Sequence, residues 1–124
     1  MTSGVVLTVE ALNPNDVPRY LFATCEQVAA VVAMIGRPGI GVQLDVYHCH
    51  QVGDDVASVV SELKDVIAHV QIADAPGRAE PGTGEVDFTR FFASLDENGY
   101  QGWIGCEYYP LGSPEEGLVW RTRY

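Results

Sequence analysis

The stretch HVQIADAPGRAEPGTGEVD at residues 69–87 decides how this chain is interpreted. Apolar and polar residues alternate at its start, which predicts a strand over 69–73. A loop must follow, because Gly and Pro recur at Pro76, Gly77, Pro81, Gly82 and Gly84. Gln71 and Asp74 border this loop and Arg78 lies within it. A strand that delivers polar side chains into a Gly-rich loop is how α/β enzymes build sites, although an ordinary surface connection is the alternative.

The same order of strand and helix occurs four times along the chain. Buried strands are predicted at 5–9, 41–48, 69–73 and 103–106, from apolar and β-branched runs. Helices are predicted over 28–35, from Asp54 or Asp55 to 67, from Asp87 to Gly99, and from Ser113 onward. Such alternation predicts an α/β fold with a parallel sheet and right-handed crossovers. From the residues alone, four units could form a small open sheet.

The helix ends carry recognisable signals. Thr24 with Gln27 three residues later predicts a capping box, and Gly36 ends that helix. Ser113 followed by Pro114 and Glu116 predicts a second capping box near the end of the sequence.

The overall composition excludes several classes of protein. The chain has 124 residues, and 7 Lys and Arg against 17 Asp and Glu give a net charge of −10. This charge opposes binding to nucleic acid or to an anionic membrane, and no apolar run has the length of a membrane span. Three cysteines without a pairing pattern and no secretory signal at residues 1–10 favour the reducing cytoplasm.

A polar residue ends each predicted strand: Glu10, Asp45, Gln71 and Glu107. Because the carboxyl ends of parallel strands meet at one edge of a sheet, we expect these four side chains to converge. Oxygen ligands of this kind suit a hard divalent cation such as Mg²⁺ or Mn²⁺. A single acidic residue at a strand end would more often be a helix cap or a solvated charge.

Four motifs resemble the hydroxypyruvate isomerase family, within the xylose isomerase-like (β/α)8 TIM barrels. They are VEALNPNDVP at 9–18, LDVYH at 44–48, HVQIADAPGRAEPGTGEVDF at 69–88 and GWIGCEYYP at 102–110. The resemblance covers almost the whole chain in the right order. It implies that residues 1–124 form a single domain, the (βα)4 C-terminal half of such a barrel, with outer helices.

The resemblance also implies an activity and roles for residues. The family interconverts hydroxypyruvate and tartronate semialdehyde through an enediolate, and glyoxylate metabolism is the implied setting. Glu10 and Glu107 would be the acid and base, and His48 and Arg78 would bind the hydroxy or keto acid. Glu10, Asp45, Gln71 and Glu107 would hold a metal. Related sugar epimerases have His where this chain has Gln71, a weaker neutral ligand, which predicts a lower metal affinity here.

Several alternatives stay open. Arg78 could pair with Glu80 or Glu85 on the surface, and His48-Cys49-His50 could bind zinc, although no second pair of ligands is suitably spaced. Cys106 is expected to be a buried apolar cysteine.

Two other functions also compete. An isolated half-barrel could be inactive and self-associate, for instance as a homodimer, through its open sheet edges. A related ketose 3-epimerase is the third function, against which Gln71 and the Gly-rich loop argue.

Overall fold

The computed structural model describes residues 4–124, so residues 1–3 of the expected single domain lie outside the described part. Its centre is a parallel sheet in which the strands follow one another in chain order. The strands are β1 (Leu7–Glu10), β2 (Ile40–Asp45), β3 (Ile67–Ile72) and β4 (Ile104–Cys106). This order confirms the predicted half of a TIM barrel, since neighbouring barrel strands are neighbours in sequence.

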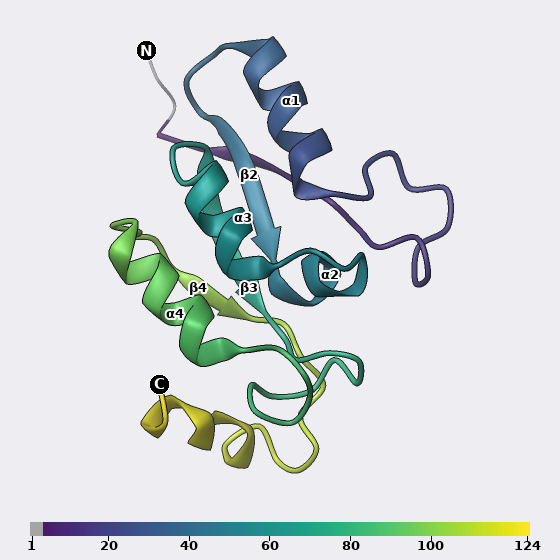
Figure 1. Cartoon of the computed structure of the whole chain (residues 1–124), viewed down its shortest axis with the longest axis vertical. Coiled ribbons are helices and arrows are strands. Elements are labelled where there is room, and N and C mark those ends of the chain that lie inside the picture. Colours follow the sequence, from purple (N-terminus) through teal and green to yellow (C-terminus); the bar gives the residue numbers. More distant parts are fainter. Residues whose placement is uncertain (1–3) are drawn as a thin grey trace.

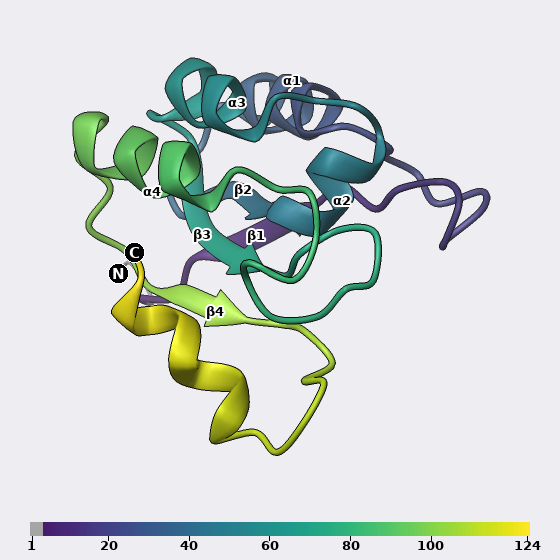
Figure 2. The same cartoon turned by 60° about the horizontal axis from the view of Figure 1, so that its bottom comes forward.

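Three α-helices lie in a row over one face of the sheet (Figures 1 and 2). They are α1 (Cys25–Ile35), α3 (Val56–Leu63) and α4 (Phe88–Glu97). A short α-helix, α2 (Val46–Gln51), lies at the carboxyl end of β2, and a 3₁₀ helix, η1 (Glu116–Thr122), ends the chain. The predicted outer layer of helices is therefore confirmed. No helix among residues 4–124 has both the length and the apolar character needed to cross a bilayer.

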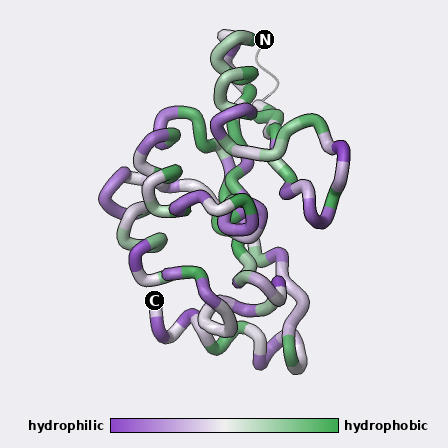
Figure 3. Tube along the Cα trace, turned by 45° about the vertical axis from the view of Figure 1, so that its right-hand side comes forward, coloured by the Kyte–Doolittle hydropathy of each residue, from purple (hydrophilic) through white to green (hydrophobic). Residues whose placement is uncertain are grey.

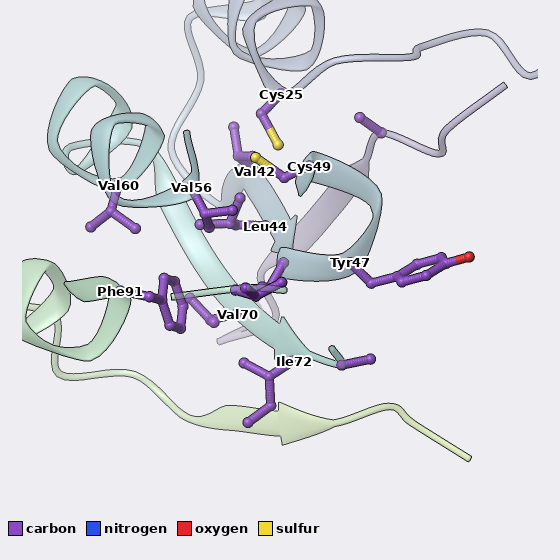
Figure 4. Close-up of a cluster of buried hydrophobic side chains, with 14 of the residues drawn as sticks. Cys25, Val42, Leu44, Tyr47, Cys49, Val56, Val60, Val70, Ile72 and Phe91 are labelled. Atoms are coloured by element: carbon purple, nitrogen blue, oxygen red, sulfur yellow. The ribbon is translucent and has the colours of Figure 1, made fainter. Parts of the chain in front are cut away.

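The core lies between the sheet and these helices (Figure 4). Leu44 of β2 and Val70 of β3 are fully buried there against α3 and α4, whose Val60 and Phe91 are buried as well. Each such side chain contributes about 1.5–3 kcal/mol on burial. Hydropathy follows the same division, with apolar strands and polar surrounding loops (Figure 3).

The helix caps form largely as predicted. The side chain of Thr24 accepts a hydrogen bond from Gln27 N at 3.3 Å, the Gln27 side chain accepts from Thr24 N, and Gly36 ends α1 with φ 58°. The box between Ser113 and Glu116 also forms. However, it precedes a 3₁₀ helix.

Several predicted boundaries are wrong. The second strand ends at Asp45 instead of residue 48, because the Asp45 carboxylate accepts from His48 N at 3.0 Å and thereby starts α2. Helix α3 ends at Leu63 and β3 begins at Ile67, so the predicted helix overran into the next strand. Apolar residues on both sides of that short turn look continuous in sequence. The first strand begins at Leu7 instead of residue 5.

Among the described residues, β1 and β4 each pair along one edge only. The position of β4 at the rim explains why Cys106 is exposed, contrary to the expected buried cysteine. Leu7 of β1 is 65% exposed and Trp103, just before β4, is 87% exposed. Apolar surface therefore gathers along both outer strands.

Candidate active site

The four strand-end residues lie at the same edge of the sheet, as their spacing predicts. Glu10 and Asp45 are the last residues of β1 and β2, and Gln71 pairs with Asp45 in the strand register. Glu107 follows β4 directly, and its N–H donates to Ile72 O at 3.0 Å, which continues the ladder. The topology thus brings three carboxylates and one amide to a common edge.

Gln43 of β2 connects these side chains and was not predicted as a site residue from the sequence. Its Nε2 donates to Glu10 Oε2 at 2.9 Å and also to Gln71 Oε1, while its own Oε1 accepts from Thr8 Oγ1 at 2.9 Å. The signal was available, because Gln43 lies two residues before Asp45 and so points to the same face of the strand.

Arg78 reaches the same group from the Gly-rich loop. Its Nη2 lies 3.0 Å from Glu107 Oε2 and 3.7 Å from Asp45 Oδ2. Its guanidinium also lies 4.8 Å from the centre of the Tyr47 ring, a cation–π contact. The alternative of a surface pair with Glu80 or Glu85 is therefore wrong.

The buried carboxylate of Asp74 organises the loop that carries Arg78. Its Oδ1 accepts from Ala75 N at 2.8 Å and Val86 N at 3.1 Å, and its Oδ2 accepts from Gly82 N at 2.8 Å and Gly84 N at 2.9 Å. Four main-chain donors on one carboxylate fix both ends of the loop, since hydrogen bonds to a charged acceptor are strong.

The same loop is attached to the segment after Glu107. Tyr109 N donates to Arg78 O at 2.9 Å, and Leu111 N donates to Oε1 of the buried Glu80 at 2.9 Å. Arg78 itself has a left-handed backbone with φ 54°. Hydrogen bonds from the main chain of the segment after Glu107 thus hold the loop so that Arg78 lies beside Glu107.

His48 lies on α2, one turn beyond Asp45, and is buried. Its Nδ1 lies 3.1 Å from Asn13 N and 2.8 Å from Asn13 Nδ2. The adjacent Cys49 points instead into the core beside Cys25 (Figure 4). This separation argues against a zinc site made by residues 48–50.

Burial changes the proton affinity of the site. It raises the pKa of Asp45 to about 7, and the neighbouring carboxylates Glu10 and Glu107 act in the same direction. Burial also raises the pKa of Glu10, with the charge of Glu107 as a further cause. The pKa of His48 is lowered, mainly by burial and also by the charge of Arg78. Burial therefore favours the neutral forms of Asp45, Glu10 and His48.

A divalent cation fits this donor set. Ligand atoms of Glu10, Asp45 and His48 lie within 4.8 Å of one another. The buried Asp45 Oδ2 has no hydrogen-bond partner, which is unusual for a buried acceptor. A cation would satisfy that oxygen and offset the repulsion between the carboxylates. The oxygen of Gln71 is already engaged by Gln43, so its role as a ligand remains a prediction.

Comparison with known proteins identifies the family. A family model described as xylose isomerase-like TIM barrel matches residues 1–123. The chain belongs to the xylose isomerase-like TIM barrel family. The 2-oxo-tetronate isomerase of Pectobacterium atrosepticum is 41% identical over 94% of this chain and 45% of its own length. The hydroxypyruvate isomerase of Escherichia coli is 33% identical over 100% of this chain and 48% of its own.

Solved structures of similar proteins agree with the fold. An AP endonuclease, family 2, from Brucella melitensis superposes with a TM-score of 0.92 at 37% identity, covering 98% of this chain and 47% of that one. A 3-keto-D-glucoside 4-epimerase from E. coli has a TM-score of 0.85 at 26% identity, with 98% and 47% covered. The chain thus spans about half the length of the relatives it matches.

Proposed function

We propose that this chain carries the active-site half of an isomerase that interconverts hydroxypyruvate and tartronate semialdehyde (2-hydroxy-3-oxopropanoate). The observation that carries the proposal is the convergence of Glu10, Asp45 and Glu107 at one edge of the sheet, where Arg78 pairs with Asp45 and Glu107. Relatives named hydroxypyruvate isomerase and 2-oxo-tetronate isomerase support this class of reaction.

The reaction moves a proton between neighbouring carbons. A base removes a proton from C3 of hydroxypyruvate to give an enediolate, the hydroxyl proton passes from O3 to O2, and an acid returns a proton to C2. We assign Glu107, which faces Arg78, as the base. We assign Glu10, the other glutamate at the strand ends, as the acid.

The remaining groups stabilise negative charge. Mg²⁺ or Mn²⁺ held by Glu10, Asp45, Gln71 and Glu107 would supply Lewis-acid polarisation of the substrate oxygens. Arg78 offers the planar donor pair that suits the substrate carboxylate, and His48 offers a further donor. Both residues already lie at the edge where the carboxylates converge.

Turnover of hydroxypyruvate tests the proposal. The chain is assayed with Mg²⁺ or Mn²⁺ and with a chelator, beside Glu107→Gln and the matched control Glu97→Gln on the exposed side of α4. We expect the control to retain its turnover rate. The turnover rate of Glu107→Gln should fall by at least about a hundredfold, as it does when a catalytic acid or base is removed. A folded sample that turns over no acid, or a Glu107→Gln variant that works normally, would refute the assignment.

A second substrate has support from the relatives. Two proteins named 2-oxo-tetronate isomerase, from Pectobacterium atrosepticum and Haemophilus influenzae, are 41% and 40% identical to this chain. A 2-oxo acid one carbon longer would undergo the same proton transfer at C2 and C3. Parallel assays of the three-carbon and four-carbon acids, with a ketose to detect 3-epimerase activity, decide between these substrates.

We also propose that a second copy of the chain covers the open strands. Leu7 at one rim and Trp103 at the other are large apolar side chains that are mostly exposed. Exposed apolar residues beside an unpaired strand favour contact with another chain. Solution mass tests this proposal: we expect a dimer that Leu7→Lys weakens, and a monomer at micromolar concentration would exclude it.

A further inference from the structure

The hydrogen bonds around His48 determine which of its ring nitrogens carries the proton. The backbone N–H of Asn13 points at Nδ1 from 3.1 Å, and a main-chain N–H can only donate. Nδ1 must therefore accept, and the proton of a neutral imidazole must lie on Nε2.

The side chain of Asn13 gives the same answer independently. Its Oδ1 accepts from Asp16 N at 3.0 Å, which fixes the orientation of the amide group. Its Nδ2 then has two hydrogens for two neighbours, Asp16 Oδ2 at 3.1 Å and His48 Nδ1 at 2.8 Å. Asn13 is fully buried, so water does not compete for these groups.

We propose that Asn13 is a positioning residue that holds His48 in the neutral Nε2–H form, so that His48 is a hydrogen-bond donor to the substrate and not a ligand of the cation. A metal ligand must offer a lone pair, and the lone pair of His48 lies on Nδ1, where Asn13 occupies it. A proton added to Nδ1 would face two donors. His48 therefore keeps one role throughout, donating to an oxygen that gains negative charge.

This inference rests on the proposed function only in one respect, namely that the Nε2–H of His48 donates to the substrate. The tautomer itself is a property of the folded chain. Glu10, Asp45 and His48 are three residues whose ligand atoms lie close enough together to hold a cation. With His48 excluded as a ligand, the carboxylates of Glu10 and Asp45 are the two of this group that can bind it.

Nitrogen NMR of the ring tests the tautomer without turnover. In ¹⁵N-labelled chain, His50→Gln and His69→Gln identify the His48 signals. We expect Nε2 protonated and Nδ1 unprotonated in the wild type, in Asn15→Ala, an exposed residue of the same loop, and in Asn13→Ala, whose main-chain N–H still donates to Nδ1. Loss of the Asn13 amide should move the Nδ1 signal of Asn13→Ala toward that of a less hydrogen-bonded nitrogen. A wild-type Nδ1–H form, or an Nδ1 signal that is the same in Asn13→Ala and the wild type, would overturn the proposal.

Addition of Mg²⁺ tests the second half of the proposal. We expect the Nε2–H signal to persist at saturating Mg²⁺, with saturation established by calorimetry. Loss of that proton on titration would make His48 a ligand and refute the assignment. In the hydroxypyruvate assay, Asn13→Ala should lower kcat by about tenfold to a hundredfold with little change in KM, the usual loss on removal of an orienting partner. An inactive wild type would contradict the proposed function and leave the NMR result valid.

Discussion

Arg78 and Glu107 form an ion pair of 3.0 Å between a loop and the residue that follows β4. The pair places a positive charge among carboxylates before any substrate or cation is bound. A substrate carboxylate that binds Arg78 must therefore share the guanidinium with Glu107, which couples substrate binding to the state of the proposed base.

Arg78→Lys should weaken substrate binding even though the charge is kept. Lysine lacks the planar donor pair, and the loss of a hydrogen bond to a charged group is worth about 1.5–3 kcal/mol, or roughly tenfold to a hundredfold in KM. Steady-state kinetics with hydroxypyruvate measure this change. Arg90→Lys, which affects a surface pair with Asp55 at 2.7 Å, is the control and should leave KM unchanged. Equal KM values for both variants would argue against Arg78 as a carboxylate ligand.

Asp45 should make the cation-free chain less stable as pH rises. The unfolded carboxyl releases its proton near pH 4, whereas the folded one keeps it up to about 7. The folded state thus binds more protons in this interval, and the free energy of unfolding falls by up to about 4 kcal/mol between pH 4 and 7.

Urea unfolding in chelator at pH 5 and pH 8 measures this effect. The fall in the free energy of unfolding between pH 5 and pH 8 should be smaller in Asp45→Asn, which keeps an oxygen that accepts from His48 N. It should also be smaller in the wild type with Mg²⁺, because the cation binds only the folded site. A wild type and an Asp45→Asn variant with the same pH dependence would contradict the prediction.

Asp74→Asn should loosen the loop that carries Arg78. An amide can accept only through its oxygen, so its NH₂ group would face two of the four main-chain donors. Leaving buried donors unpaired costs about 1–3 kcal/mol each. Hydrogen exchange should become faster at one pair of the four amides, Gly82 and Gly84 or Ala75 and Val86, and the urea midpoint should fall, while Asp65→Asn, at an exposed site, should change neither. Unchanged exchange at these amides would show that Asp74 does not hold the loop.

Two glycines of the same loop should respond differently to alanine. A Cβ at Gly84 would lie 2.0 Å from Ala75 O and 2.7 Å from Asp74 Oδ1, whereas a Cβ at Gly77 would meet nothing within 4 Å. We expect Gly84→Ala to lose at least about 2 kcal/mol of stability by displacing the Asp74 contacts. Gly77→Ala should be neutral or stabilising by up to about 1 kcal/mol. Thermal unfolding of both variants decides the point, and equal melting temperatures would contradict it.

The parts of the fold that follow local rules could be predicted from the sequence. Repeated strand and helix patterns gave the parallel sheet, and the topology then placed Glu10, Asp45 and Glu107 at one edge. The capping box at Thr24 was equally local. Helix α2 was missed because VYHC continues the apolar pattern of β2, and only the Asp45 cap marks the change of structure.

Residues that act through distant partners could not be predicted. Asn13 lies in a loop whose Pro and Asn content predicts only a turn, yet its partner is 35 residues away on α2. The contacts of Asp74 span up to 12 residues of loop, and no periodic pattern encodes such a path. Both residues are buried polar groups, which composition alone cannot distinguish from solvated ones.

The attachment of the Gly-rich loop has a consequence for how such proteins diverge. Its shape depends on the carboxylates of Asp74 and Glu80 and on main-chain amides that every sequence possesses. Mutations at exposed side chains of the loop that make none of these contacts, such as Glu85, can therefore accumulate without loss of the loop conformation. New substrate preferences could evolve there one residue at a time, while the strands beneath keep the reactive groups in place.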